Sequence, residues 1–283
     1  MRVLVTGCEG MLGRRLVEEA ARRGHAVTGL DRPGFELARP AEAARQLREA
    51  RPELVIHGAA ITDVDGCESQ AEFAMAINGE ASGVLARGAA EIGARCVYVS
   101  TDYVFDGAKD APYLEDDPTG PATAYGRSKL RGEERVLAAG GSVLRLSWSF
   151  GPDGKNFVAT IAGLLGEGRT LKVVDDQQGS PTFTRDSAAA ILDLGEAGGE
   201  GVYHCCNAGA TTWYGFARAV AVGMGLAPER VTPCGSADYP RPAPRPANSR
   251  LGGTRLESLR GRPLPPWQDA LNRYLEEMGW LAR

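Results

Sequence analysis

The stretch Val3-Leu4-Val5-Thr6-Gly7-Cys8-Glu9-Gly10-Met11-Leu12-Gly13 decides the fold of this chain. Residues 3–6 form a short apolar run typical of a buried strand, and residues 11–23 carry apolar side chains at helical spacing. The glycines between them permit a tight turn, close approach of a pyrophosphate to the backbone, and close helix packing. The unpaired N–H groups of the helix N-terminus attract phosphates. The sequence therefore predicts a strand, turn and helix that bind a dinucleotide, with Gly7 and Gly10 at the phosphates.

The second predicted strand, residues 25–31, ends at an acidic residue that bears on the cofactor. Asp31 follows Gly13 by 18 residues, where a carboxylate binds the ribose hydroxyls of the adenosine. Arg32 comes next and suits the 2′-phosphate that distinguishes NADP from NAD. A solvated surface charge explains Arg32 equally well. The choice between NADH and NADPH therefore stays open at the sequence level.

Strand-like and helix-like segments alternate along the first half of the chain. Strands are expected at residues 3–6, 25–31, 54–60, 96–100 and 142–148, and helices at 11–23, 41–50, 72–92 and 125–139. Such alternation requires crossover connections, hence a parallel sheet with helices on both faces. The predicted fold class is α/β, a Rossmann-type doubly wound parallel sheet with a smaller mixed C-terminal substrate domain.

The rhythm loosens after residue 149. Helices are expected at residues 157–165, 185–196, 213–223 and 267–278, strands at 170–174 and 201–205, and residues 228–246 hold six prolines. We therefore assign residues 1–149 to a dinucleotide-binding domain and residues 150–283 mainly to a substrate-binding domain, from which some segments return to the first.

Composition excludes several classes of protein. The 283 residues are 43% hydrophobic and 24% charged, with a net charge of −4, which is typical of a globular chain with no excess of positive charge for nucleic acid. No apolar run is long enough for a signal peptide or a membrane span. The six cysteines form no C-x-x-C pair, and no metal site is expected. We expect a cytoplasmic protein.

Tyr125 and Lys129 lie four residues apart at the start of a predicted helix, which places both on one face. A nearby ammonium is expected to lower the pKa of Tyr125 from its usual ~10 and to make the phenol a usable general acid. Thr101 lies at the carboxyl end of the fourth predicted strand, where ligands bind in open α/β sheets. Its hydroxyl is placed to hydrogen-bond the same substrate oxygen that Tyr125 protonates.

Together these residues resemble the extended short-chain dehydrogenase/reductase superfamily. Further stretches, spread over nearly the whole chain, narrow the resemblance to its dTDP-4-dehydrorhamnose reductase family. They are Ala59-Ala60-Ile61-Thr62-Asp63-Val64-Asp65, Ser100-Thr101-Asp102-Tyr103-Val104-Phe105-Asp106-Gly107, Arg145-Leu146-Ser147-Trp148, Asp176-Gln177-Gln178-Gly179-Ser180-Pro181-Thr182, Gly201-Val202-Tyr203-His204, Thr211-Thr212-Trp213 and Arg245-Pro246-Ala247-Asn248-Ser249-Arg250-Leu251.

The resemblance implies reduction of the 4-keto group of dTDP-4-dehydro-6-deoxy-L-mannose to dTDP-L-rhamnose, with NADPH or NADH as cofactor and Thr101, Tyr125 and Lys129 as the catalytic set. The expected dinucleotide-binding residues are Gly7, Gly10, Met11, Leu12, Asp31, Arg32, Glu36, Leu37, Ala60, Ile61, Thr62, Tyr125 and Lys129. The expected substrate-binding residues are Thr101, Asp102, Trp148 and Arg245, the last as a diphosphate ligand.

Two alternatives remain: a non-catalytic dinucleotide-binding regulatory subunit of a partner enzyme, and a reductase of another nucleotide-linked keto-sugar. An intact Thr101, Tyr125 and Lys129 favours catalysis, because a pure binding module needs no tuned phenol. Some members of the family that the chain resembles are described as dimers bridged by a divalent cation through acidic residues, one of which lies early in the first helix. Here that position reads Arg14-Arg15, which argues against a cation bridge and leaves a homodimer open.

Overall fold

A six-stranded parallel sheet forms the centre of the computed structural model, which describes residues 1–282. The strand order is β10-β5-β4-β3-β1-β2. Their bounds are β1 (Arg2–Thr6), β2 (Ala26–Leu30), β3 (Leu54–His57), β4 (Arg95–Thr101), β5 (Ser142–Leu146) and β10 (Gly201–Cys205). The central strands are buried along nearly their whole length, as a parallel sheet covered on both faces requires. The predicted doubly wound sheet is confirmed.

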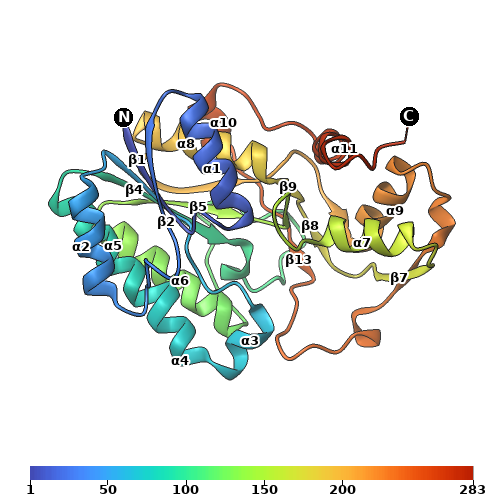
Figure 1. Cartoon of the computed structure of the whole chain (residues 1–283). Coiled ribbons are helices and arrows are strands. Elements are labelled where there is room, and N and C mark those ends of the chain that lie inside the picture. The colour runs from blue at the N-terminus through green and yellow to red at the C-terminus, as the bar shows by residue number, and fades with distance from the viewer. Residues whose placement is uncertain (283) are drawn as a thin grey trace.

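Helices cover both faces of this sheet (Figure 1). One face carries α1 (Met11–Arg22), α8 (Thr184–Ala197) and α10 (Arg255–Arg260), and the other carries α2 (Pro40–Ala50), α5 (Ser82–Glu91) and α6 (Ala124–Ala138). Each face has its own apolar core, built around Leu16 and Ile191 on the first and around Leu47 and Leu85 on the second. The order in which strands are added to the sheet reverses at β1, since β2 lies on one side of it and β3 on the other, both parallel to it. Ligands of open α/β sheets bind at the carboxyl edge beside such a reversal.

The helix expected at residues 72–92 is interrupted. The structure has α3 (Val64–Ser69), α4 (Ala71–Ala74), the π-helical segment η1 (Met75–Ala81) and then α5. The wider π turn leaves the backbone carbonyl of Asn78 free to accept hydrogen bonds from the Tyr98 hydroxyl at 2.9 Å and from Ser82 Oγ at 2.7 Å. The spacing of apolar residues in the sequence does not reveal this π-helical turn.

A second, smaller body of helices and short strands follows residue 148. Its helices are α7 (Phe157–Gly166), α9 (Trp213–Gly223) and α11 (Trp267–Glu277), and its paired strands β7 (Leu171–Val174) and β12 (Val231–Cys234) are parallel. Its remaining elements are β6 (Ser149–Phe150), β8 (Gln178–Gly179), β9 (Thr182–Phe183), β11 (Thr211–Thr212), β13 (Asn248–Ser249) and the 3-10 turns η3 (Pro228–Arg230) and η4 (Ser236–Asp238). Phe150, Phe183, Phe216 and Tyr274 form its aromatic core. The 3-10 turn η2 (Asp102–Val104) directly follows β4 in the sheet body.

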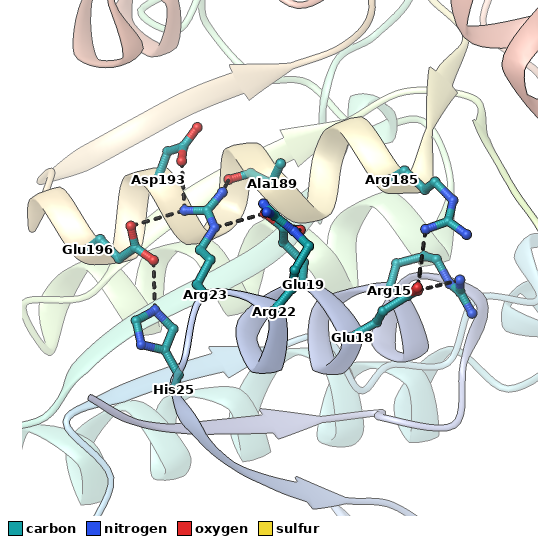
Figure 2. Close-up of polar contacts among 10 residues, drawn as sticks. All are labelled: Arg15, Glu18, Glu19, Arg22, Arg23, His25, Arg185, Ala189, Asp193 and Glu196. Atoms are coloured by element: carbon teal, nitrogen blue, oxygen red, sulfur yellow. Dashed lines mark hydrogen bonds and ion pairs between the residues drawn. The ribbon is translucent and has the colours of Figure 1, made fainter.

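Three elements from the second half of the chain, β10, α8 and α10, lie in the sheet body. β10 pairs with β5, and α8 packs on α1. An ion-pair network joins α8 to the end of α1 (Figure 2). Arg23 is its centre and donates to Glu19 at 2.8 Å, Asp193 at 2.8 Å, Glu196 at 3.0 Å and the Ala189 carbonyl at 3.0 Å. The network therefore fixes the helix that follows the glycine turn against the opposite half of the sequence.

Over residues 1–282, no helix combines the length and apolar character needed to cross a membrane. Within the same residues, no three His, Cys, Asp or Glu side chains come together in a group that could hold a metal ion.

Candidate active site

The glycine turn between β1 and α1 has the shape that a pyrophosphate needs. Gly7 adopts a φ of +72°, and a Cβ placed on Gly13 would lie 1.9 Å from the Gly7 carbonyl oxygen, so the turn closes only without side chains. No side chain caps the N-terminus of α1 at Gly10, and its first turn holds no acidic residue. By contrast, Thr123 caps α6 through the Gly126 N–H at 2.9 Å. The uncapped N–H groups of α1 fit a phosphate ligand.

The end of β2 lies beside this turn. The Asp31 carboxylate accepts hydrogen bonds from the backbone N–H of Glu9 at 2.8 Å and of Arg32 at 2.8 Å, which ties it to the glycine turn. The Arg32 side chain is exposed, as expected for either of its two interpretations. Glu36 pairs with Arg39 at 3.3 Å, and Leu37 is 8% exposed with its side chain in the core beneath.

The segment after β3 forms another wall of the site. Residues 60–62 are half-buried or exposed, and Asn78 holds them through the N–H of Ile61 at 2.8 Å and its carbonyl at 3.0 Å. The Asn78 Nδ2 that donates to the Ile61 carbonyl also donates to Ser128 Oγ on α6 at 3.0 Å. One buried side chain therefore connects the predicted cofactor-binding segment to the helix that carries Tyr125 and Lys129.

The structure brings Thr101, Tyr125 and Lys129 into one region. The start of α6 packs directly on η2, because a Cβ on Gly126 would lie 2.1 Å from the Tyr103 carbonyl oxygen. Thr101 Oγ1 donates to Asp102 Oδ1 at 2.8 Å and accepts from the Tyr103 N–H at 3.2 Å. All three predicted catalytic side chains are at most 8% exposed. Because these side chains are buried, a substrate atom in contact with them would be largely shielded from water.

Burial controls the titration of these groups. Burial raises the pKa of Tyr125 well above its usual value, and a hydrogen bond with the Thr101 hydroxyl acts in the opposite direction. The expectation that Lys129 lowers the pKa of Tyr125 is therefore wrong for this structure, because burial raises that pKa and the neighbouring Asp102 carboxylate raises it further. Burial also lowers the pKa of Lys129 to about 7, against the opposing effect of the Glu133 carboxylate. Its Nζ donates to the Val99 carbonyl at 2.7 Å.

Asp102 is a buried carboxylate without a cationic partner. It is 4% exposed and accepts hydrogen bonds from Thr101 Oγ1 at 2.8 Å and Ser147 Oγ at 3.0 Å. Burial raises its pKa to about 6, with the hydroxyls of Thr101 and Ser147 acting against the rise. A carboxyl group of this kind titrates near neutral pH and is able to donate or accept a hydrogen bond.

Trp148 has a strained backbone, with a φ of 43° that side-chain-bearing residues rarely adopt. Its indole stacks on Trp213 with ring centroids 3.4 Å apart, and its Nε1 donates to Ser249 Oγ at 3.0 Å. These contacts hold a half-buried aromatic face next to Ser147, the partner of Asp102. Strain of this kind concentrates at ligand sites.

Arg245, the expected diphosphate ligand, is bound within the chain. Its Nη2 lies 2.9 Å from Asp65 Oδ2, and its Nη1 donates to the Ala243 carbonyl at 3.0 Å. A cavity of about 50 Å³ beside it is lined by Tyr103, Thr123 and Arg245 among others. Arg245 therefore lies near η2, with its guanidinium held by Asp65 rather than free.

Sequence reasoning missed several residues of this region. Asn78 is a polar residue inside an Ala-rich helical stretch, and Tyr98 is the one aromatic residue of a β-branched strand. Neither stands out by residue type, because Glu80 and Ser82 nearby are also polar and tyrosine is common in strands, so no local signal in the sequence marks them. Trp213 lies in a stretch that carried the family resemblance, but the sequence gives no reason for it to meet Trp148. Only the packing of α9 reveals that contact.

Comparisons with known proteins agree with this geometry. The family model described as RmlD substrate binding domain matches residues 1–279. A dTDP-4-dehydrorhamnose reductase of Burkholderia thailandensis is 42% identical over 98% of this chain and 99% of its own, and one of Mycobacterium tuberculosis is 44% identical over 95% and 91%.

Solved structures give the same result. The crystal structure of a dTDP-4-dehydrorhamnose reductase from Clostridium acetobutylicum has a TM-score of 0.93 at 35% identity and covers 99% of this chain and 100% of its own. That of Bacillus anthracis, in complex with NADP, has a TM-score of 0.92 at 32% identity and covers 98% and 99%. The chain belongs to the RmlD substrate-binding-domain family.

Proposed function

We propose that this protein is an NAD(P)H-dependent dTDP-4-dehydrorhamnose reductase, which converts the 4-keto sugar to dTDP-L-rhamnose. The observation that supports the proposal is the packing of α6, the helix of Tyr125 and Lys129, on η2, the turn that follows Thr101 at the carboxyl end of β4. The uncapped N-terminus of α1 after the glycine turn supports the binding of a dinucleotide. The identity to reductases of known name over nearly the whole chain supports the substrate.

The dinucleotide supplies a hydride to the sugar carbonyl carbon when bound. We propose that Gly7, Gly10 and the N–H groups of α1 hold its pyrophosphate, with Met11, Leu12 and residues 60–62 along the dinucleotide. In this arrangement Asp31 and Glu36 face the adenosine ribose, and Arg32 lies beside them. The Leu37 side chain is buried in the core, so only its backbone is proposed to contact the dinucleotide. The turn fits such a group, because no side chain caps the N–H groups of α1 at Gly10 and the absence of a Cβ at Gly13 lets α1 pack directly on the backbone of Gly7.

Tyr125 is the proposed general acid and donates its phenolic proton to the sugar oxygen. Its pKa, raised by burial, keeps the phenol protonated at neutral pH in the free protein. Lys129 stabilises the phenolate that remains after proton transfer. Thr101 has a single O–H, which donates to Asp102 in the structure, so its hydroxyl must rotate to polarise the sugar carbonyl. Asp102, Trp148 and Arg245 are proposed to contact the nucleotide-sugar.

The test is a reaction of purified protein with dTDP-4-dehydrorhamnose and NADPH or NADH. We expect one reduced dinucleotide to be oxidised per sugar, with dTDP-L-rhamnose identified by NMR. Tight dinucleotide binding without turnover would instead support a regulatory subunit, and turnover confined to another keto-sugar would support a reductase of different specificity. A homodimer and a cytoplasmic location stay predictions from the sequence.

A further inference from the structure

Lys129 is an ammonium group buried without an acidic partner. Its side chain is 2% exposed, and among the ion pairs of residues 1–282 none includes it. Glu133, one helical turn further along α6, is occupied by Arg145, whose Nη2 and Nε lie 2.7 and 2.9 Å from its carboxylate. Because burying an ammonium in an apolar medium is costly, another group must compensate the charge.

The ring of Tyr98 lies against the Lys129 ammonium and is the group that compensates its charge. Lys129 Nζ lies 4.0 Å from the ring centroid, well within the range of a cation–π interaction, which is strongest when the cation is desolvated. Tyr98 is fully buried, so water does not weaken the contact. The Val99 carbonyl, at 2.7 Å from Nζ, is the other recorded partner of the ammonium.

The Tyr98 ring is itself held on three sides. Its hydroxyl donates to the carbonyl of Asn78 in the π turn at 2.9 Å, and the His57 ring lies at a centroid distance of 5.4 Å. Gly132 on α6 leaves the space, since a Cβ there would lie 2.4 Å from the Tyr98 hydroxyl oxygen. The π turn, β3 and α6 thus all meet at this ring, which makes its position hard to change.

We propose that Tyr98 is a positioning residue for the reduction: its ring face holds the Lys129 side chain in the charged form and fixes its position on the helix that also carries Tyr125. The role in the reaction rests on the proposed function, whereas the contact between Tyr98 and Lys129 does not. The ring of a buried phenylalanine would stabilise the Lys129 ammonium equally well, because the cation contacts the ring face. The Tyr98 hydroxyl instead fixes the position of the ring through its hydrogen bond to the Asn78 carbonyl.

Among the charged groups around Lys129, the Glu133 carboxylate favours the ammonium form although Arg145 occupies its hydrogen bonds. Burial and the Lys129 charge together lower the pKa of His57 to about 3, so His57 is neutral at pH 7 and donates or accepts only through Thr6 Oγ1 and Ser82 Oγ. The titratable and charged side chains that face this region are Tyr125 and Glu133 from α6, His57 from β3, Tyr98 from β4 and Arg145 from β5, with Asp102 of η2 bound to Thr101 and Ser147.

The titration of Lys129 can be measured directly, because the chain has only four lysines: Lys109, Lys129, Lys155 and Lys172. Protein labelled with ¹³C at lysine Cε gives four NMR signals, which single Lys→Arg variants at 109, 155 and 172 assign. We expect Tyr98→Phe to leave the titration of Lys129 within about 0.3 pH units of the wild type. Tyr98→Leu is expected to lower it by about one unit, because the π face is lost. Equal titration in Phe and Leu variants would overturn the proposal.

A second series keeps the shape of the ring and therefore the fold. Fluorinated phenylalanines incorporated at position 98, with one, two and three fluorines, withdraw electron density stepwise. The Lys129 titration is expected to fall with each added fluorine, and the alkaline limb of the kcat profile to move to lower pH with it. A titration that does not change along the series would contradict the proposal. Because the NMR measurement uses no substrate, a failed reductase assay leaves it unaffected, and the converse also holds.

Discussion

The Glu133 carboxylate accepts two hydrogen bonds from Arg145, at 2.7 and 2.9 Å, and the two side chains are only 2% and 4% exposed. The pair joins α6 to β5 beneath the candidate active site. Arg145 also stacks on Phe105, with its guanidinium carbon 4.9 Å from the ring centroid, and lies 3.3 Å from His204 Nε2. A buried pair of this kind depends on both partners, because either charge alone would remain uncompensated.

Glu133→Gln should therefore destabilise the protein by about 3–5 kcal/mol, the usual cost of breaking a buried ion pair. Glu134→Gln, at the neighbouring exposed position, is the matched control and should change stability by less than about 1 kcal/mol. Urea unfolding followed by circular dichroism measures both. Similar losses in the two variants would show that the buried pair has no special role.

Tyr125→Phe should lower kcat by about 10²- to 10⁴-fold, because it removes the proton donor and keeps the ring. Dinucleotide affinity should remain within about threefold, as measured by fluorescence titration. A kcat within about threefold of the wild type would show that another group supplies the proton.

Asp102 should make the stability of the protein depend on pH. Its folded pKa of about 6 lies above the ordinary 3.8, so the unfolded chain loses the proton first and stability falls as pH rises from about 4 to 6. A rise of about two units corresponds to about 3 kcal/mol. Asp102→Asn removes this cost, so its stability relative to the wild type should increase over the same pH range while KM rises. Unfolding curves at pH 4.5 and 7.5 test this; a difference that does not depend on pH would refute it.

Arg32→Ala should weaken NADPH binding by about tenfold and NADH binding by much less, because only NADPH carries a 2′-phosphate for the guanidinium. Arg39→Ala is the control, since Arg39 is 72% exposed and pairs with Glu36. Calorimetric titration with each dinucleotide gives the comparison. Equal losses for both would place Arg32 away from the adenosine ribose.

The protein should not dehydrate dTDP-glucose in the presence of catalytic NAD⁺. Elimination of water needs both a base and an acid beside the sugar. Asp102 is followed by Tyr103, whose pKa burial raises further, so the phenol is a poor base at neutral pH. Product analysis by NMR decides the matter, and a 4-keto-6-deoxy sugar in that mixture would mean that elimination occurs here.

Local patterns in the sequence predicted the parts of the structure that depend on one element at a time. The glycine turn, the parallel strands and the placement of Tyr125 and Lys129 on one helix face all follow from spacing. The π turn at Asn78, the stacking of Trp148 on Trp213 and the burial that raises the pKa of Tyr125 depend on which elements meet. No pattern within a single segment contains that information. The Asp65 partner of Arg245, 180 residues away in the sequence, is the clearest example.

The return of β10 to the edge of the sheet sets the order in which a nascent chain is able to mature. β5 is paired on one side by β4 and on the other by β10, which is synthesised more than 50 residues later. Until residue 205 has left the ribosome, β5 is an unpaired edge strand of the sheet. Until α8 has left it, Arg23 at the end of α1 lacks its partners Asp193 and Glu196. An excised fragment of residues 1–149 keeps that edge permanently, and unpaired strand edges promote aggregation.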